Sequence, residues 1–487
     1  MADMSRWVPL RWPWPDASLL SILDGTPVNC LVVDWAAGQR QALAPLVEKC
    51  KAAGHALVGM VSGGDRAAAF QSARAAGLDA VIAEGDAPDA PLPVLPLSER
   101  AKTPWNSPSP ILAVNDNVWP ATALAPARGD ALTGPTNSPW IDSNAWFLRL
   151  ARVRARAKTC WLLFDPPGPP DIVPAETYLR AVADAAAFGG RWVVSLDEKL
   201  RAGLAAGDTG ATGTWKTLAN ALAFFEKHRG WTALEPQGVV GVVSDFAGAN
   251  EMVGTELLNL IGRRNLPFRI VDKSVAEGAS LAGFKALVAV DEELPPPALR
   301  RRLLDFAEQG GVLLVSQSWQ GERGTPTGQP HPRIDIRRLG KGKLAVAKGD
   351  APDPFMVARD IHVLLGRAED LTRYFNIEAF ISSYAASPDG TPNHTPEGAP
   401  DHAASPDGTP EHAASPDGAH ALFQVTSFSR RLQDDRVSVW FRRPYRAAQL
   451  WTIGSEAPSP AAMTSENGGI TVQVPGMKTY AAIELSG

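Results

Sequence analysis

The stretch Val28-Asn-Cys-Leu-Val-Val-Asp34 begins the pattern that decides the fold of this chain. A segment with helical apolar spacing follows it at 41–53, Gly54 marks a helix stop, and a second apolar run begins at Ala56. Alternation of short apolar runs with single helices requires parallel strands, because each helix returns the chain to the same edge of the sheet. The stretch therefore predicts an α/β fold.

The same unit recurs as far as residue 236, with helical spacing again at 65–76, 175–188 and 214–228. An open doubly wound sheet would show the same local pattern, but eight strands in about 200 residues is the number that closes a (β/α)₈ TIM barrel. The expected barrel strands are 28–34, 56–62, 80–84, 94–97, 111–116, 160–165, 192–197 and, as the weakest, 231–235.

The remaining sequence predicts two smaller domains. A second α/β unit begins at Gly238, with four expected strands (239–244, 268–271, 286–290 and 312–316) and a flavodoxin-like pattern. Period-two alternation near the C-terminus predicts a small antiparallel β-sandwich. The expected organisation is an N-terminal extension (1–27), the barrel (28–236), the α/β domain (237–335), a connecting hairpin and helix (336–384), a low-complexity insert (385–420) and the sandwich (421–487).

The insert repeats Ala-Ala-Ser-Pro-Asp-Gly at 385–390, 403–408 and 413–418. Ser-Pro-Asp-Gly is turn chemistry and the segment has few apolar residues to bury, so disorder is expected. Four of the eight histidines of the chain fall in it, which we attribute to repeat expansion in preference to metal binding.

Composition excludes several function classes. The 487-residue chain has 47 Lys and Arg against 52 Asp and Glu, a net charge of −5 that lacks the basic footprint of a nucleic-acid binder. No apolar run reaches the length of a membrane span, so a soluble protein without a membrane partner is expected. Its compartment stays open, cytoplasmic or exported after removal of a signal peptide. Three cysteines without CxxC spacing predict neither disulfides nor a zinc site, and we expect no metal or cofactor.

Acidic residues end several expected barrel strands, where the active sites of TIM barrels lie. Cleavage of a glycosidic bond needs two carboxyl groups, one protonated and one ionised. We predict Asp165 and Asp197 as this pair, with Glu198 and Asp34 as substitutes. Each could instead cap a helix, as Asp197 could before Glu198.

The 15 tryptophans include three in or beside expected loops at the same rim, Trp35, Trp119 and Trp140. An indole face suits the apolar face of a sugar ring, whereas core packing explains tryptophans within strands. The segment 134–146 is the densest polar and aromatic cluster, and one of its polar residues must cap the helix that follows. The predicted sugar site comprises Trp35, Asp116, Trp119, Trp140, Asp142 and Asn144.

Other catalytic motifs are absent: the sequence has no GxxxxGK[ST], no GxGxxG after a strand, no HExxH and no GxSxG. Sequences from Gly238 to Phe246, Gln309 to Val315, Leu339 to Leu344, Val472 to Gly476 and Tyr480 to Glu484 resemble the family 42 glycoside hydrolases and related barrel glycosidases. The resemblance covers most of residues 238–487 through short motifs. It implies a barrel, an amidotransferase-like domain used for assembly, and a β-sandwich.

The chain departs from that family at its catalytic positions. The resemblance implies an Asn-Glu pair after the fourth strand, but the fourth run ends Pro96-Leu-Ser-Glu99, and the single Asn-Glu pair is Asn250-Glu251 in the second domain. Residues 238–330 contain no cysteine, so an amidotransferase-like domain here should be catalytically silent and serve homo-oligomer contacts.

Two hypotheses follow: a glycoside hydrolase acting on a carbohydrate substrate, or a non-catalytic carbohydrate-binding or assembly protein on a degenerate glycosidase scaffold. The hydrolase requires two rim carboxyl groups within about 10 Å of each other.

Overall fold

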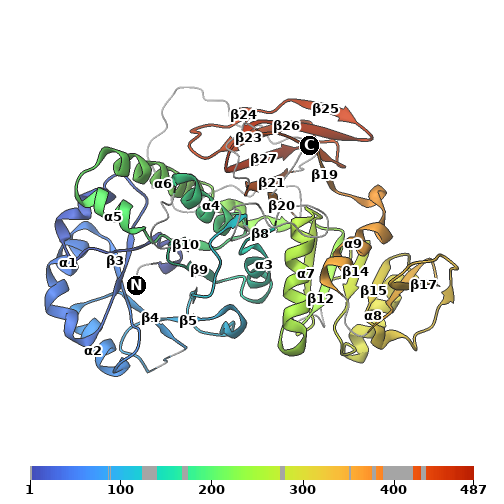
Figure 1. The fold of residues 1–487 in the computed structure, drawn as a ribbon, viewed down its shortest axis with the longest axis horizontal. Helices are drawn as coiled ribbons and strands as arrows, with labels where there is room; N and C mark the ends of the chain where they lie inside the picture. The colour runs from blue at the N-terminus through green and yellow to red at the C-terminus, as the bar shows by residue number, and fades with distance from the viewer. Residues whose placement is uncertain are drawn as a thin grey trace, which may run out of the picture.

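The chain folds into three bodies, a barrel at the left of Figure 1, an α/β domain at the right and a sandwich above both. The N-terminus lies at the barrel and the C-terminus in the sandwich. The computed structural model describes residues 3–85, 87, 89–122, 140–166, 174–274, 280–349, 353–375, 380–387, 420–428 and 435–487.

The first body is an eight-stranded parallel sheet in the order β1-β2-β3-β4-β5-β6-β9-β10. It closes on itself where Leu10 of β1 bridges Val194 next to β10, and the Arg11 amide donates to the Val194 carbonyl at 2.8 Å. The predicted TIM barrel is confirmed. Its strands are β1 (Pro9–Arg11), β2 (Cys30–Asp34), β3 (Ala56–Met60), β4 (Ala80–Glu84), β5 (Val94–Ser98), β6 (Ile111–Val114), β9 (Thr159–Leu163) and β10 (Arg191–Val193).

The first barrel strand lies within the segment predicted as an extension. β1 is three residues long and contains Pro9, so the sequence pattern hid it, although Leu10 is fully buried. The expected eighth strand at 231–235 is wrong, because this segment forms a 3₁₀ helix (Arg229–Ala233) and then a strand of the sandwich, β11 (Glu235–Pro236). The predicted number of strands is correct, and each expected strand moves one place further along the barrel.

The described residues of the barrel form six α-helices, which lie around its strands (Figure 1). Gly54 and Gly77 end the first two in the left-handed conformation, with φ of 74° and 79°, as the sequence predicts. A two-stranded ribbon, β7 (Ala121–Thr122) and β8 (Ile141–Asp142), precedes the third. The helices are α1 (Arg40–Ala53), α2 (Arg66–Ala76), α3 (Ala145–Arg154), α4 (Ala175–Ala186), α5 (Glu198–Ala205) and α6 (Thr209–Lys227).

The second body has the strand order β13-β12-β14-β15-β18-β17-β16, whose first five strands are parallel, as in flavodoxin-like sheets. The predicted hairpin forms β17 and β18, and it belongs to this sheet because β18 pairs with β15. The elements are β12 (Val240–Ser244), α7 (Glu251–Arg263), β13 (Phe268–Asp272), β14 (Ala286–Ala289), α8 (Pro297–Glu308), β15 (Val312–Val315), β16 (Thr325–Pro326), β17 (Ile334–Leu339), β18 (Gly342–Ala347) and α9 (Pro354–Leu365).

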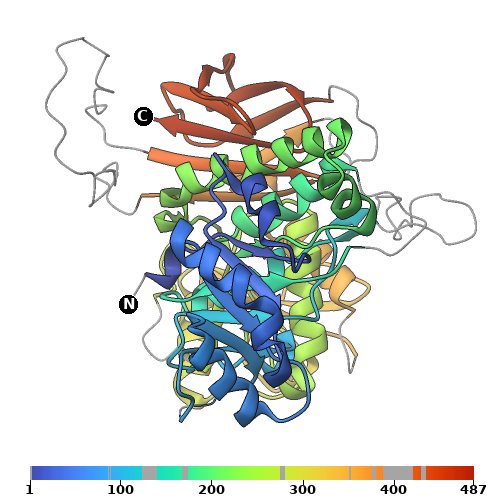
Figure 2. The same cartoon turned by 90° about the vertical axis from the view of Figure 1, so that its left-hand side faces the viewer.

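The third body is the predicted sandwich, with sheets β11-β20-β21-β27-β23-β24 and β19-β22-β26-β25 enclosing an apolar core. Figure 2 shows it stacked above the barrel helices, where Arg180 of α4 donates to the Ser427 carbonyl at 2.9 Å. Most of the insert, residues 388–419, lies outside the described residues, between paired β20 and β21. The strands are β19 (Thr372–Phe375), β20 (Phe380–Ala386), β21 (His420–Ser427), β22 (Asp435–Phe441), β23 (Ala447–Thr452), β24 (Ser459–Pro460), β25 (Met463–Glu466), β26 (Gly469–Met477) and β27 (Tyr480–Ser486).

Within the described part of the chain, no helix combines the length and the apolarity needed to cross a membrane.

Candidate active site

A cavity of about 860 Å³ opens at the carboxyl ends of the barrel strands, and we call it the mouth cavity. Parallel strands place the residues that follow them at one rim, so side chains far apart in sequence meet there. All four predicted catalytic carboxylates line this cavity. Its charged and hydroxyl-bearing residues include Arg11, Asp34, Asp165, Ser195, Asp197 and Glu198.

Arg11, at the end of β1, holds two of these carboxylates. Its guanidinium donates to Asp165 at 2.6 Å and, through its other terminal nitrogen, to Asp34 at 3.3 Å. Because the guanidinium is a small planar fork, the two accepting oxygens are no more than about 8 Å apart. This separation meets the requirement for a glycosidase pair.

Asp165 is fixed more firmly than Asp34. The Ser195 hydroxyl also donates to the oxygen of Asp165 that faces Arg11, at 3.0 Å. The Asp34 and Asp165 side chains remain 66% and 67% exposed, so a ligand in the cavity can reach both.

Asp197 is a helix cap. One of its carboxylate oxygens accepts from the Leu200 amide at 2.9 Å, and the other accepts from the Tyr178 hydroxyl at 2.8 Å. Both carboxylate oxygens of Asp197 therefore take part in hydrogen bonds that hold α4 and α5. In the predicted pair of Asp165 and Asp197, Asp197 thus has no carboxylate oxygen without a hydrogen bond. Glu198, in the first turn of α5, is exposed at the cavity wall.

Two of the predicted sugar-site tryptophans serve other roles. Trp35 is only 3% exposed and its indole nitrogen donates to the Ala69 carbonyl at 3.2 Å, so it packs in the barrel core and offers no face to a sugar. Trp140 lies under the Arg263 guanidinium of α7, 4.2 Å from its ring centroid, and so joins the barrel to the α/β domain.

Trp119 and Asp116 also lie apart from the residues that line the mouth cavity. The Trp119 ring packs against Phe164, Tyr178 and Trp192, with centroid distances of 5.3–6.4 Å. Asp116 accepts from the Arg100 amide at 2.7 Å and pairs with the side chain of Arg100. Both residues stabilise the loop that follows β6.

Asp142 and Asn144 are structural. Desolvation raises the pKa of Asp142, which lies half-buried near the domain junction. Asn144 is fully buried, and its side chain donates to the Val118 carbonyl at 2.9 Å and accepts from the Val118 amide at 3.1 Å. The polar residues at 140–144 therefore build the entry to α3, and residues 134–139 lie outside the described chain.

Asp184 of α4 accepts hydrogen bonds from the residues that precede α3. It accepts from the Ser143 hydroxyl and the Asn144 amide, and it is completely buried. Burial raises the pKa of Asp184 to about 6, against the opposing effect of these hydrogen bonds.

The sequence interpretation missed Arg11, Trp12 and Trp14, which line the mouth cavity because β1 is a barrel strand. Trp12 and Trp14 meet edge to face with centroids 4.8 Å apart, and Trp14 is partly exposed. The buried Leu10 followed by Arg11 repeats the apolar-then-charged ending of Val33-Asp34, and this was the available signal.

Among the described residues no group of three His, Cys, Asp or Glu side chains is placed to hold a metal ion. The three cysteines are buried thiols.

Comparisons with known proteins support the fold. No family model matches the sequence, and no curated protein does. Alpha-L-fucosidase isoenzyme 2 from Paenibacillus thiaminolyticus shares the fold with a TM-score of 0.58 at 11% identity, over 99% of this chain and 99% of that chain. The resemblance to barrel glycosidases is thus confirmed at the level of the fold.

Two other solved glycoside hydrolases match less closely. The GH42 beta-galactosidase Gan42B from G. stearothermophilus has a TM-score of 0.42 at 9% identity, over 92% of this chain and 66% of that chain. A rhamnosidase from Novosphingobium sp. PP1Y has a TM-score of 0.43 at 10% identity, over 92% of this chain and 39% of that chain.

Proposed function

We propose that this chain is a glycoside hydrolase whose active site is the mouth cavity. The observation that carries the proposal is the convergence of Asp34 and Asp165, from opposite flanks of β1, on the single guanidinium of Arg11. A carboxyl pair within about 10 Å at the carboxyl end of a parallel barrel is the arrangement that glycosidic cleavage needs.

The hydrogen bonds assign different roles to the two acids. Asp165 accepts hydrogen bonds from Arg11 and Ser195, which hold its carboxylate in position, so we assign it the attack on the anomeric carbon or the removal of a proton from an attacking water. Asp34 has one oxygen with no hydrogen-bond donor among the described residues, so we assign it the delivery of a proton to the leaving oxygen. The carbon–oxygen bond breaks and the hydroxyl of water ends on the anomeric carbon. Glu198 is the substitute acid.

The substrate is a carbohydrate, bound by groups that match its two faces. Arg11 and Gln39 offer hydrogen bonds to ring hydroxyls, and the partly exposed Trp14 offers an apolar face. These groups replace Trp35, Trp119 and Trp140 as the proposed sugar contacts.

A second candidate is a carbohydrate-binding or assembly protein without turnover. The observation that favours it is the same ion pair, because the guanidinium that both acids share occupies carboxylate oxygens that catalysis would need.

The α/β domain is proposed to be amidotransferase-like and to serve homo-oligomer contacts. Met252 of α7 is 77% exposed and provides an apolar contact for a second copy. Light scattering of Met252→Lys should give a lower mass than the wild type if this face mediates assembly, and equal masses would remove the assignment.

Hydrolysis with a panel of aryl glycosides tests the proposed function. Asp165→Asn should lower kcat/KM by about a thousandfold or more on any substrate that the wild type cleaves, as expected for loss of a catalytic carboxylate (about 4 kcal/mol). Asp65→Asn is the matched control, because Asp65 caps α2 and Asn caps a helix equally well. Equal rates for Asp165→Asn and the wild type would contradict the proposal. Saturable sugar binding without turnover, weakened by Asp165→Asn, would establish the second candidate.

A further inference from the structure

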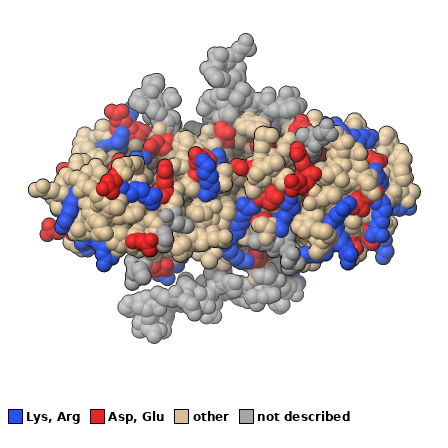
Figure 3. Space-filling view, turned by 90° about the horizontal axis from the view of Figure 1, so that it is seen from below, with Lys and Arg blue, Asp and Glu red and all other residues tan. Residues whose placement is uncertain are grey.

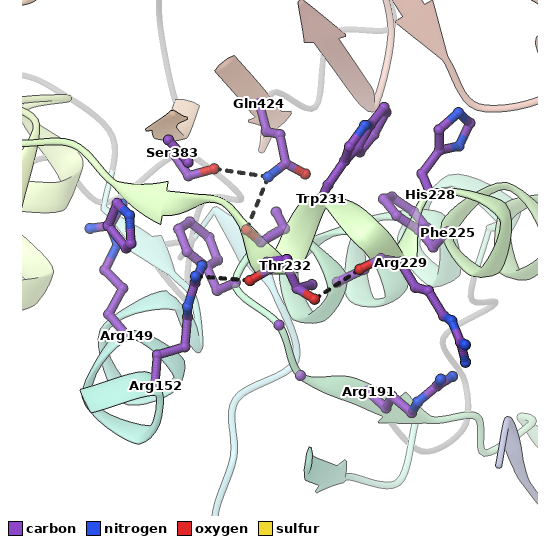
Figure 4. Close-up of a pocket in the computed structure, with 18 of the residues that line it drawn as sticks. Arg149, Arg152, Arg191, Phe225, His228, Arg229, Trp231, Thr232, Ser383 and Gln424 are labelled. Carbon is purple, nitrogen blue, oxygen red and sulfur yellow. Dashed lines mark hydrogen bonds between the residues drawn. The ribbon is translucent and has the colours of Figure 1, made fainter. Parts of the chain in front are cut away.

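A second and larger cavity, of about 1170 Å³, lies at the opposite end of the barrel, and we call it the basal cavity. Its walls come from the amino ends of β1, β9 and β10, from the start of β13 in the α/β domain, and from β20 and β21 of the sandwich. Figure 4 shows the side chains that surround it. The three domains therefore enclose one space that the proposed hydrolysis does not use.

The charge of the basal cavity is strongly biased. Seven Lys and Arg residues line it against two Glu residues, although the chain as a whole has a net charge of −5. On the face of the molecule seen in Figure 3, by contrast, cationic and anionic side chains are interspersed. The seven cations are Arg149, Arg152, Arg156, Arg191, Lys227, Arg229 and Arg269.

Both carboxylates of the basal cavity are already occupied. Glu226 pairs with Arg191 through two hydrogen bonds, and Glu235 pairs with Arg156. The other five cations form no ion pair within the described chain. The basal cavity thus contains five cations that form no ion pair with its own side chains.

Four of these five cations donate to backbone carbonyls, namely Arg149, Arg152, Lys227 and Arg269. Arg149 lies between the Phe188 and Phe268 rings, at 4.6 and 4.5 Å, and donates to the Ser382 carbonyl. Arg152 donates to the Thr232 carbonyl at 2.9 Å. Carbonyl oxygens satisfy the hydrogen bonds without a formal charge, and burial lowers the pKa of Arg149 to about 10 although Asp184 acts in the opposite direction. An anion in the basal cavity would remove this electrostatic cost.

Arg191 and Arg229 present guanidinium groups on one side of the basal cavity, opposite Arg149 and Arg152 (Figure 4). Arg229 is exposed and Arg156 is 65% exposed, so both are accessible to a ligand that enters from solvent. The planar fork of arginine matches the oxygens of phosphate and sulfate.

We propose that the basal cavity binds a small polyanion that carries two or more phosphate or sulfate groups. Several cations spread around a cavity of this volume suit separated anionic groups better than one small ion. The site lies at the end of the barrel opposite the mouth cavity, so it goes beyond the proposed hydrolysis and does not depend on it.

Calorimetric titration of the full chain tests the proposal with two probes, tripolyphosphate and sucrose octasulfate. At least one should bind saturably with one equivalent per chain, and its Kd should rise with salt concentration because the contacts are ionic. Tripolyphosphate binding alone would identify a phosphate site, and octasulfate binding alone a sulfate site.

The double variant Arg156→Gln/Arg229→Gln should weaken the bound probe at least tenfold. Both side chains are exposed, so folding should persist, and circular dichroism checks it. Arg229→Glu is a second variant, with an expected loss at least as large. Arg323→Gln, a surface arginine paired with Glu308 outside the basal cavity, should keep Kd within twofold. Failure of both probes to bind at low salt, or equal affinity in the double variant and the wild type, would overturn the proposal.

Discussion

The cavities at the two ends of the barrel differ in the domains that line them and in the balance of their charges. At the mouth cavity, every lining residue comes from the barrel, and two of the four acids, Asp34 and Asp165, pair with Arg11. At the basal cavity, three domains contribute, and cations outnumber acids with most left unpaired. The mouth cavity is therefore formed by the barrel alone, whereas the basal cavity forms only when the three domains pack together.

Breaking the domain junction should therefore have the largest effect and should affect the basal cavity first. Arg154 of α3 pairs with Asp272 at the end of β13, whose side chain is fully buried. Arg154→Met leaves that carboxylate uncompensated and should cost about 3–5 kcal/mol of unfolding free energy. Denaturant unfolding measures the loss, and Arg156→Gln, which breaks an exposed pair just beyond the end of the same helix, should cost about 1 kcal/mol or less. Similar losses in both variants would contradict this account of the junction.

The next prediction concerns Asp184, which fixes the start of the helix that carries Arg149 and Arg152. Its pKa of about 6 in the folded chain exceeds the value of about 3.9 in unfolded chains, so the folded state holds the proton more tightly. The stability contribution is fully present below about pH 4 and is lost as pH rises to about 6, by roughly 3 kcal/mol.

Unfolding free energies measured across this pH range should fall more steeply for the wild type than for Asp184→Asn, which does not titrate. Only the slopes are compared, because the amide changes the hydrogen bonds with Asn144. Parallel slopes would exclude a titrating Asp184.

At the mouth cavity, Arg11→Met should lower kcat/KM about 10- to 100-fold, because both carboxylates lose the fork that orients them. The kcat/KM of Arg11→Lys should lie between those of the wild type and Arg11→Met, since an ammonium group retains the charge but lacks the planar fork of the guanidinium. Affinity of the basal cavity for its anion should stay within twofold. An unchanged kcat/KM in Arg11→Met would show that Arg11 does not orient the catalytic carboxylates.

The smallest effect is expected at Asp197. Asp197→Ala should cost about 1 kcal/mol of unfolding free energy through loss of the α5 cap, and Asp197→Ser, which restores a cap, should recover most of it. Thermal unfolding and aryl glycoside hydrolysis are measured together. A thousandfold loss of activity in Asp197→Ser with unchanged stability would show that Asp197 is a catalytic carboxylate after all.

Local pattern was enough to predict the barrel, the order of the three bodies and the helices at 41–53, 65–76, 175–188 and 214–228, because apolar periodicity and glycine stops are local signals. Barrel closure is not local: β1 is defined by pairing with β2 and β10, and its Pro9 disguises it. That error hid Arg11 and with it the feature that joins Asp34 to Asp165.

The tryptophans misled for a related reason. Trp35 and Trp140 follow or flank strands in the sequence, but packing against α2 and α7 decides which way each indole points. The sequence showed Asp142 and Asn144 as part of one polar cluster. The buried Asp184 that binds Asn144 lies 40 residues away, so residue spacing could not predict this contact.

Two adjacent strands run from one cavity to the other. Val8 and Pro9 line the basal cavity while Arg11 and Trp12 line the mouth cavity, and in β10 Arg191 faces the former while Ser195, just beyond it, faces the latter. A ligand that shifts either strand along its axis therefore changes the surroundings of both sites. By thermodynamic reciprocity, a polyanion that alters sugar affinity must have its own affinity altered by the sugar by the same factor. The closing seam of the barrel is thus a rigid connection through which the two ends can be coupled.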